Sequence, residues 1–273
     1  ARCCATMGRI TVEANMGAIG AVMKYGTEKQ KRIAAEYVLS GDKPAICITE
    51  PKAGSAATEM TTTAEQKGDK YIINGQKYWI TGGGVSRFHL IFAKLIEGGE
   101  PKGIAGFIAL RGINSGLEIG DREPAMGVRG IPETYVYFND LEVDMDMIVV
   151  PPEGIRRGFA GLMNAYNAQR VGAGTVALGI AQGAYEKALA YALEREQFGR
   201  PIAEFQGLQW IMADMSIGLD ASRSLLHIAA RSAGSGFPNM EASAKAKVLA
   251  SETAIKVTND ALQIHGSMGY SRS

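Results

Sequence analysis

The stretch Ile46–Ser55 carries residues that can hold an anion at a turn. It is a short apolar run that breaks at Pro51 and Gly54, and the break is expected to expose backbone amides and the hydroxyls of Thr49 and Ser55. Gly54 can adopt dihedral angles that other residues avoid, and Ser55 supplies a donor. Such a turn can therefore bind an anionic group.

A second stretch, Tyr78–Thr81, adds a flat aromatic ring and another hydroxyl group. Trp79 and Thr81 are two residues apart, and residues at this spacing on a strand lie on the same face. Together with the turn in Ile46–Ser55, these side chains suit a flat, polar-edged, phosphorylated ring system as the ligand.

The run Gly172-Ala-Gly174-Thr-Val-Ala177 matches a dinucleotide-binding fingerprint in its spacing. No strand is expected before it and helical patterning lies on both sides, so we interpret its small residues as allowing close helix packing. A flavin bound by this chain would therefore be held without a Rossmann unit. His89, His227 and His265 stand apart from other ligand-type residues, and the sequence predicts no metal site.

The composition is that of an ordinary globular protein. Hydrophobic residues make up 46% and charged residues 21% of the 273 positions, which allows a sizeable core and two domains rather than one. The formal net charge of +1 gives no field that would favour nucleic acid or an anionic membrane. No apolar run reaches the length of about 18 residues that spans a bilayer. Cys3, Cys4 and Cys47 predict reduced thiols in an intracellular protein, and the first residues lack a secretory signal pattern.

Patterning along the chain divides it into three parts. Residues 1–43 are expected to be helical, with a break at Gly26-Thr27, where Thr27 can cap the following helix. Residues 44–150 contain short strand-like segments between turns, which indicates a barrel or a sandwich. Residues 151–273 return to helical spacing, with a last helix expected from about Glu241 to His265.

The pair Asn74-Gly75 is a strong local signal for a tight turn. It is flanked by two apolar segments, Lys70–Ile73 and Gln76–Ile80, that are typical of strands. The sequence therefore predicts a β-hairpin whose turn lies at Asn74-Gly75.

Several short motifs occur in the order in which one known family has its signatures. They are Gly26-Thr-Glu-Lys-Gln30, Ile48-Thr-Glu-Pro51, Asn74-Gly-Gln-Lys77, Trp79-Ile-Thr81, Met126-Gly-Val-Arg-Gly130, Arg195-Glu-Gln-Phe-Gly199, Phe205-Gln206 and Gln263-Ile-His-Gly266. In these motifs the chain resembles the acyl-CoA dehydrogenase family over nearly its whole length.

The resemblance implies an α+β multidomain fold with three domains. Part of an N-terminal helical domain would occupy residues 1–43, a central β-barrel residues 44–150, and an incomplete C-terminal four-helix bundle residues 151–273. The family's earlier helices and the segment that follows the last helix have no counterpart here, so the chain is expected to be a fragment.

The resemblance also assigns roles to residues. FAD would be contacted by Ile48, Thr49, Gly54, Ser55, Trp79 and Thr81 in one subunit, and by Arg195, Phe198, Gln206, Gln263 and Gly266 from the neighbouring subunit. The acyl-CoA would be contacted by Ser55, Tyr166, Asn167 and Arg170. A guanidinium on a pyrophosphate, as implied for Arg195, is a strong charge-assisted pairing.

The activity that the resemblance implies is FAD-dependent dehydrogenation of an acyl-CoA thioester to a trans-2-enoyl-CoA. A carboxylate would remove the α-proton while the β-hydride passes to the flavin, and an electron-transferring flavoprotein would accept the electrons. The resemblance further implies a homo-oligomer, as a dimer of dimers, in the bacterial cytoplasm or the mitochondrial matrix.

The chain departs from the family pattern at the catalytic base. In most members a Glu lies beyond the position where this sequence ends at Ser273, and in others it precedes the residue matched by Arg170, where this chain has Gln169. Ala56 also replaces the usual Asp after Gly54-Ser55. Alternatives of the same fold therefore stay open: an acyl-CoA oxidase, an enoyl-CoA reductase, or a non-redox member of the desulfinase type. A non-catalytic scaffold subunit is a further alternative, and it predicts no bound flavin.

Overall fold

The computed structural model of the chain describes residues 1–271 and divides them into two compact units. The sheet unit comprises Glu13–Tyr166, and the helical unit comprises Ala1–Val12 together with the chain from Asn167 onward. Each unit has its own hydrophobic core.

The first part of the chain is helical, as predicted, and consists of α1 (Ala5–Asn15), α2 (Ala18–Tyr25) and α3 (Glu28–Leu39). Thr27 caps α3 as expected: its hydroxyl accepts from the Gln30 backbone amide, and the Gln30 side chain accepts from the Thr27 amide. The break between α1 and α2 was not predicted. It lies at Gly17, whose φ of 58° belongs to the left-handed region that glycine tolerates best.

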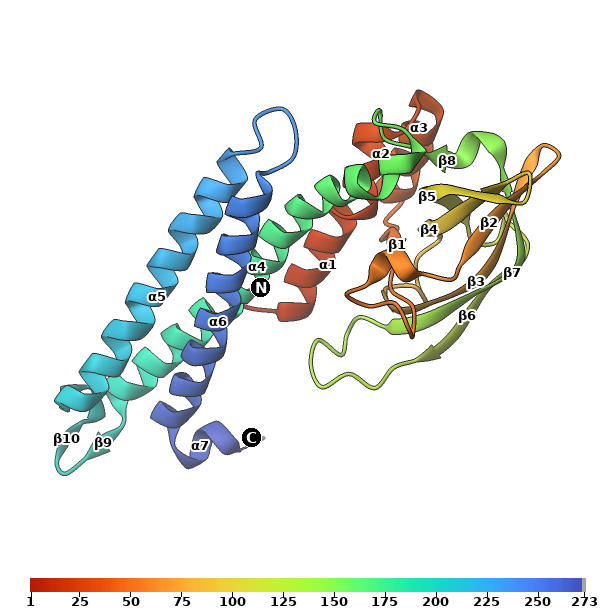
Figure 1. Cartoon of the computed structure of the whole chain (residues 1–273). Helices are drawn as coiled ribbons and strands as arrows, with labels where there is room; N and C mark the ends of the chain where they lie inside the picture. The colour runs from red at the N-terminus through yellow and green to blue at the C-terminus, as the bar shows by residue number, and fades with distance from the viewer. Residues whose placement is uncertain (272–273) are drawn as a thin grey trace. The chain divides into compact units, whose positions relative to one another are not determined.

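The strands of the sheet unit form one eight-stranded sheet (Figure 1). They are β1 (Ala45–Cys47), β2 (Thr63–Lys67), β3 (Lys70–Thr81), β4 (Phe88–Glu97), β5 (Glu100–Leu110), β6 (Leu117–Arg122), β7 (Glu133–Asp144) and β8 (Ile148–Val149). Short 3-10 turns lie at Ala57–Glu59, Met145–Met147 and Ile155–Arg157. Strand order is β6-β7-β3-β2-β4-β5-β8, and β1 pairs with β4.

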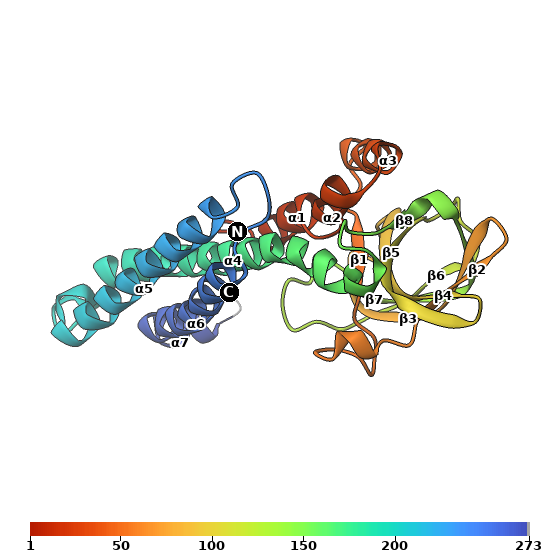
Figure 2. The same cartoon turned by 45° about the horizontal axis from the view of Figure 1, so that its top comes forward.

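The strands curve around a common interior, as a barrel does (Figure 2). The hydrogen-bonded path nevertheless has two ends, β6 and β8, and within residues 1–271 no ladder joins them. The predicted central β-barrel thus corresponds to a curved sheet whose hydrogen-bonded path ends at β6 and β8.

The predicted hairpin at Asn74-Gly75 is wrong. Both residues lie inside the single strand β3, and the chain reverses instead between β2 and β3, where Lys67 pairs with Lys70. The register of β3 against β7 shifts between Ile73 and Gly75, and the Asn74 amide exchanges two hydrogen bonds of 2.9 Å with Asp140 on β7. The Asn-Gly pair thus lies at a β-bulge, where Gly75 adopts a φ of 142°.

The core of the sheet unit is built on β4, β5 and β7. The residues of β4 from Phe88 to Ala93 are all buried, because both faces of the strand are covered: Ala93 lies in the core of the sheet, and Phe92 on the other face meets the ring of Phe159 edge-on at 6.1 Å. Phe107 on β5 is fully buried and meets the ring of Tyr71 edge-on at 5.1 Å. This core holds the strands whose ends carry the predicted ligand contacts.

The helical unit contains three long helices in the described part of the chain. They are α4 (Gly158–Glu194, which begins in the sheet unit), α5 (Gln206–Arg231) and α6 (Met240–His265), followed by the short α7 (Ser267–Tyr270). A small hairpin of β9 (Glu196–Gln197) and β10 (Arg200–Pro201) and a 3-10 turn at Ile202–Glu204 connect α4 to α5. The helix predicted from about Glu241 to His265 is α6, and it ends at Gly266 as predicted, although the short α7 follows it.

The glycine-rich run at 172–177 lies within α4, and no strand precedes it. Gly172 and Gly174 are buried, and a Cβ atom built on Gly174 would lie 2.8 Å from Leu226 of α5 and 3.4 Å from the backbone of Lys247 in α6. Close helix packing, rather than nucleotide binding, is therefore confirmed as the role of these small residues.

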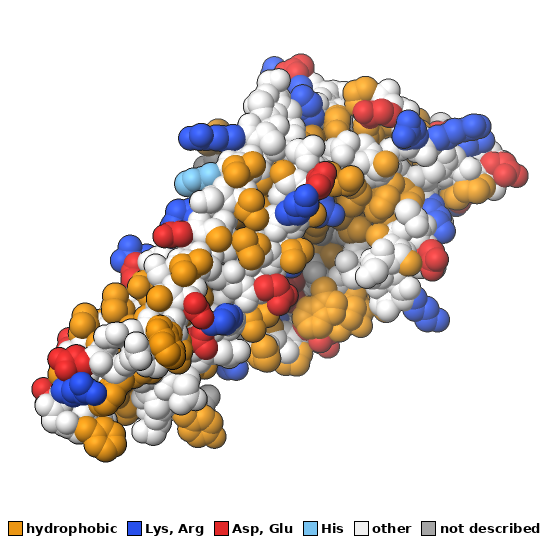
Figure 3. Space-filling view, turned by 60° about the vertical axis from the view of Figure 1, so that its left-hand side comes forward, with side chains coloured by type: hydrophobic (Ala, Val, Ile, Leu, Met, Phe, Trp, Pro, Cys, Tyr) orange, Lys and Arg blue, Asp and Glu red, His pale blue; other side chains and the backbone are white. Residues whose placement is uncertain are grey.

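None of the helices within residues 1–271 combines the length and the apolar composition that a membrane crossing requires. The helical unit does expose large apolar side chains. On α5 and α6 they are Trp210, Ile217, Ile228, Met240, Val248, Ile255 and Leu262. The visible face in Figure 3 likewise shows apolar side chains between charged ones.

Candidate functional site

The two stretches that the sequence singled out meet at one end of the sheet unit. The Tyr78 amide donates to the Thr49 carbonyl at 2.8 Å, which joins the end of β3 to the segment that follows β1. The Lys77 ammonium donates to the Ile48 carbonyl at 3.0 Å. Ile48, Thr49 and Thr81 are half-buried at this junction.

Trp79 projects from this junction toward solvent. The register of β3 against β7 shifts between Lys77 and Ile80, and Trp79 at the shift has a φ of 56°. A bulky residue in the left-handed region is strained, and such strain is concentrated at functional sites. The indole remains 46% exposed, so one flat aromatic surface is available to a ligand.

A row of aromatic rings lies beside Trp79. The Tyr78 ring is 5.1 Å from the Trp79 ring and is stacked on Tyr135 at 4.1 Å, and Tyr135 is followed by Tyr137 at 5.7 Å. A Cβ atom at Gly120 would collide with Tyr135 and Tyr137 at 2.8 and 2.7 Å, so only glycine fits beneath these rings. Desolvation and a hydrogen bond with Tyr135 raise the pKa of Tyr78 to about 12, which keeps its hydroxyl protonated.

The predicted anion-binding turn is exposed. Glu50 and Ala53 exchange two backbone hydrogen bonds of 3.1 Å and close a tight turn just before Gly54. Gly54 and Ser55 are exposed, and a Cβ atom at Gly54 would meet no other atom within 4 Å. The Ser55 hydroxyl is therefore accessible to a ligand.

A buried ion pair lies behind the turn, and sequence reasoning did not single it out. The Glu50 carboxylate accepts from the backbone amides and hydroxyls of Thr61 and Thr62 at 2.6–3.0 Å and from the Lys77 ammonium at 2.9 Å. Burial by itself would raise the pKa of Glu50, but the hydrogen bonds from Thr61, Thr62 and Lys77 lower it to about 2. The sequence shows only that Glu50 and Lys77 belong to two of the family motifs, and nothing in it indicates that they pair.

The loop after Thr81 is held through its carbonyl groups. The Thr81 carbonyl accepts from the buried Lys43 ammonium, the Gly83 carbonyl lies 3.3 Å from His89 Nε2, and the Gly84 carbonyl accepts from Arg111 at 2.7 Å. His89 is fully buried, and within the described residues its Nδ1 atom has no hydrogen-bond partner. Burial, reinforced by the Arg111 charge, lowers the pKa of His89 to about 4.

His89 should make the sheet unit sensitive to mild acid. Its pKa is about 4 when folded and about 6.5 when unfolded, so between these values the unfolded chain binds more protons and stability falls as pH falls. The full effect is roughly 3 kcal/mol. The variant His89→Leu should therefore show a much flatter free energy of unfolding between about pH 6.5 and pH 4, measured by urea unfolding.

The exposed His227 on α5 provides the control, and His227→Leu should keep the wild-type pH dependence. An unchanged slope in His89→Leu would contradict the assignment.

In the helical unit, Arg195 and Phe198 lie at the end of α4. Arg195 follows the last residue of α4 and is exposed, and its carbonyl accepts from the Ile202 amide at 2.8 Å. Phe198 occupies the tip of the hairpin with a φ of 55° and is 94% exposed. Gln206 is exposed at the first turn of α5. These three side chains are therefore exposed in this chain.

The end of α6 lies near the end of α4. The ring of His265 is stacked on Tyr191 of α4 at 4.6 Å, which brings the predicted contacts Gln263 and Gly266 to the same end of the helical unit as Arg195. Gln263 and Gly266 are both exposed, and Gly266 ends α6 with a φ of 59°. The predicted second group of cofactor contacts is thus gathered at one end of these helices.

The predicted substrate contacts follow one another along α4. Asn167 is buried, and its side-chain carbonyl accepts from Arg170 Nη1 at 2.9 Å, while Tyr166 is half-buried one residue earlier. Gln169 is 6% exposed. The amide of Gln169 is neutral and cannot act as a base, whereas the carboxylate of a Glu at this position could accept a proton.

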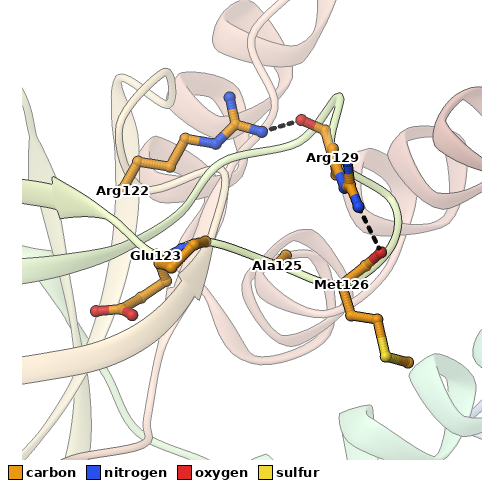
Figure 4. A pocket seen from close by; sticks show the side chains of 6 residues that line it. Arg122, Glu123, Ala125, Met126 and Arg129 are labelled. Carbon is orange, nitrogen blue, oxygen red and sulfur yellow. Dashed lines mark hydrogen bonds between the residues drawn. The ribbon is translucent and has the colours of Figure 1, made fainter.

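A hollow of about 580 Å³ lies at the loop after β6. It is lined by Arg122, Glu123, Pro124, Ala125, Met126 and Arg129 (Figure 4). The Arg122 guanidinium donates to the Arg129 carbonyl, and Arg129 donates to the Met126 carbonyl at 3.4 Å. Part of the motif Met126-Gly-Val-Arg-Gly130 thus forms one wall, and none of the predicted flavin contacts lines this hollow.

Comparison with known proteins agrees with this arrangement. The family model described as the acyl-CoA dehydrogenase middle domain matches residues 45–141, and the model of the C-terminal domain matches residues 156–273. The chain belongs to the acyl-CoA dehydrogenase family. Among its relatives, the 3-sulfinopropanoyl-CoA desulfinase of Cupriavidus necator is 69% identical over all of this chain and 69% of the relative's length. The short-chain specific acyl-CoA dehydrogenase of Clostridium acetobutylicum is 37% identical over 98% of this chain and 70% of its own.

Solved structures of acyl-CoA dehydrogenase type share the fold. The butyryl-CoA dehydrogenase from Megasphaera elsdenii has a TM-score of 0.91 and 32% identity, covering 98% of this chain and 69% of that one. A chain in the structure described as an electron transferring flavoprotein of Acidaminococcus fermentans has a TM-score of 0.90 and 36% identity, covering 97% and 69%. The α+β fold expected from the sequence, with a central sheet and a helical C-terminal part, is confirmed.

Proposed function

We propose that this acyl-CoA dehydrogenase family member is a 3-sulfinopropanoyl-CoA desulfinase. The observation that carries the proposal is a gap in sequence identity. Four relatives with that name are 61–69% identical to this chain, whereas the short-chain acyl-CoA dehydrogenase is 37% identical. A shared fold does not decide chemistry, and identity at this level over the whole chain is the stronger guide.

The proposed reaction needs no electron acceptor. The bond between C3 and the sulfinate sulfur breaks, its electron pair stays on C3, and C3 takes up a proton to give propanoyl-CoA. The sulfur leaves as sulfur dioxide, which adds water and becomes hydrogen sulfite. Substrate and water are thus converted to two products with no net oxidation or reduction of a cofactor.

Gln169 excludes one of the two positions at which the resemblance places the catalytic base. The resemblance implies that some members use a Glu at this position of α4 to remove the α-proton of the thioester. The amide of Gln169 cannot accept that proton, and its burial would make an ionised carboxylate there costly. Proton removal at the α-carbon is required for dehydrogenation and is not required for loss of the sulfinate group.

We also propose that FAD is bound, although desulfination leaves its redox state unchanged. The half-exposed Trp79 ring, the accessible Ser55 hydroxyl and the half-buried Thr49 and Thr81 fit a flat ring carrying a pyrophosphate. Bound FAD would supply its ring as a surface for the thioester, and in a dehydrogenase it would accept hydride. We propose Tyr166, Asn167 and Arg170 as contacts of the acyl-CoA, and Arg195, Phe198, Gln206, Gln263 and Gly266 as contacts to the FAD of a second subunit.

The test uses the full-length protein with its FAD under anaerobic conditions. Addition of 3-sulfinopropanoyl-CoA should release sulfite and propanoyl-CoA in equal amounts while the visible flavin band keeps its intensity. Sulfite is measured colorimetrically, and the CoA esters are measured by mass spectrometry. Butanoyl-CoA, which lacks the sulfinate group, is the control and should give no product. Bleaching by butanoyl-CoA with formation of a 2-enoyl-CoA would overturn the proposal.

Dehydrogenation is the second candidate. It is favoured by the 37% sequence identity to the short-chain specific acyl-CoA dehydrogenase of Clostridium acetobutylicum. In that case an electron-transferring flavoprotein would be the partner, as the Acidaminococcus structure suggests. Assembly as a dimer of dimers is a proposal under either activity, and the exposed apolar residues of α5 and α6 suit it. The cytoplasmic or matrix location stays a prediction.

A further inference from the structure

Two buried lysines each bind the backbone of one segment that is proposed to contact the flavin. Lys77 donates to the carbonyl of Ile48 in the first segment, and Lys43 donates to the carbonyl of Thr81 in the second. We infer that Lys77 and Lys43 are positioning residues that set the geometry of the flavin-contacting segments. This inference rests on the proposed FAD site.

Lys77 has all three of its ammonium hydrogens directed at protein acceptors. Nζ lies 3.0 Å from the Ile48 carbonyl, 2.9 Å from Glu50 Oε1 and 3.7 Å from Met60 Sδ, and the side chain has no solvent exposure. Three donors with three acceptors leave the ammonium one orientation. The Lys77 side chain is therefore held in one conformation, unlike a lysine on the surface.

Lys77 lies at the point of β3 where the bulge that carries Trp79 begins. Lys77 is paired with Val136, and the register shifts immediately afterwards, at the bulge that holds Trp79 outward. The same residue thus fixes the Ile48 carbonyl through its side chain and the start of the bulge through its backbone. Trp79 and the segment after β1 are kept in one relative position.

Glu50 holds the other side of Lys77. Its carboxylate is 4% exposed and accepts hydrogen bonds from two threonines besides the lysine. Glu50 also opens the tight turn that ends just before Gly54 and Ser55. The ion pair therefore contacts the Ile48 carbonyl through Lys77 and belongs, through Glu50, to the turn that precedes Ser55.

Lys43 repeats the arrangement at the other segment. Its ammonium contacts the Thr81 carbonyl and lies 3.8 Å from the buried carboxylate of Glu13. Its stem packs against Gly82, where a Cβ atom would lie 2.7 Å from Lys43 Cδ. Gly82, with a φ of 76°, thus leaves room for the lysine that fixes the preceding carbonyl.

A buried ion pair is weak evidence for stability, because desolvation offsets most of the attraction. A neutral replacement of both partners can therefore keep the fold while removing the hydrogen bond to Ile48. That property allows a positioning role to be separated from a structural one.

The experiment compares variants of the full-length protein purified with FAD. Its readouts are release of FAD on dilution, followed by flavin fluorescence, and the visible circular dichroism of the flavin. The double variant Lys77→Met/Glu50→Gln should bind FAD at least about tenfold more weakly, as expected for loss of a charged hydrogen bond that orders the site, and should change the flavin dichroism. Its far-ultraviolet dichroism should match that of the wild type. Lys43→Met should likewise weaken FAD binding.

The matched control is Lys70→Met. Lys70 lies on the same strand and pairs with Glu142 of β7, but the two side chains are 40% and 49% exposed and the pair is not buried. This variant should retain FAD as the wild type does.

Wild-type FAD affinity and flavin dichroism in the folded double variant would overturn the inference. A wild-type protein without FAD would overturn it as well, together with the proposed cofactor. A wild-type protein that holds FAD but releases no sulfite would contradict only the desulfinase proposal. In that case the FAD affinity of the double variant still tests the role of the two lysines.

Discussion

The variant Trp79→Gly is expected to release FAD about a hundredfold more readily than the wild-type protein, with no loss of folding stability. The indole is 46% exposed in the structure, so a ligand ring that covers it would bury apolar area on both partners. Covering about 100 Å² of apolar surface contributes roughly 2.5 kcal/mol, which corresponds to a factor of about a hundred in affinity.

Folding stability is not expected to fall together with FAD affinity, because Trp79→Gly relieves strain in the backbone. Trp79 adopts a φ of 56°, a conformation that costs an ordinary residue about 1–2 kcal/mol and costs glycine little. Glycine relieves this strain while it loses the contact with the Tyr78 ring. The free energy of unfolding without ligand should therefore stay within about 1 kcal/mol of the wild-type value or rise.

An exposed apolar residue away from the proposed site provides the control for this experiment. Ile113 lies in the loop between β5 and β6 and is 70% exposed, and Ile113→Ala should leave FAD affinity unchanged. Fluorescence of FAD released on dilution measures affinity, and urea unfolding measures stability. A Trp79→Gly protein that retains FAD and is less stable would show that the indole is a packing residue.

Phe107→Ala should cause the largest loss of stability, about 3–5 kcal/mol. The ring is fully buried at the centre of the sheet unit and meets Tyr71 edge-on, so its removal costs transfer free energy and leaves a cavity. The neighbours lie on paired strands and cannot collapse into the space without changing the register. The midpoint of thermal or urea unfolding measures the effect.

Phe198→Ala is the control for this prediction, because that ring is 94% exposed at a hairpin tip. It should leave the midpoint of the protein without FAD unchanged. A small effect of Phe107→Ala, comparable with that of Phe198→Ala, would contradict the assignment of Phe107 to the core.

Local patterns in the sequence predicted local structure well. Thr27 and Gln30 form the expected cap because both partners lie within one turn of the same helix. The run at Gly172–Ala177 was correctly interpreted as helix packing because no strand could precede it. The break at Gly17 was missed, since glycine is compatible with both a helix and its end.

The hairpin prediction failed because the same residue types occur in tight turns and at β-bulges. Asn74-Gly75 suits a tight turn or a bulge, and only the partner strand decides between them. Here Asp140 on β7 bonds the Asn74 amide from 66 residues away and holds the chain in a single strand. No window of sequence contains that partner.

The sequence by itself determined the family, because its motifs occur in a characteristic order, and it named the two segments that meet at the proposed site. Only the tertiary structure showed that the sheet has two ends, that Trp79 is held outward on a bulge, and that Lys77 and Glu50 form a buried pair behind it. The physical reason is that burial and pairing depend on residues far apart in the chain, whereas a motif records only which residues are neighbours along it.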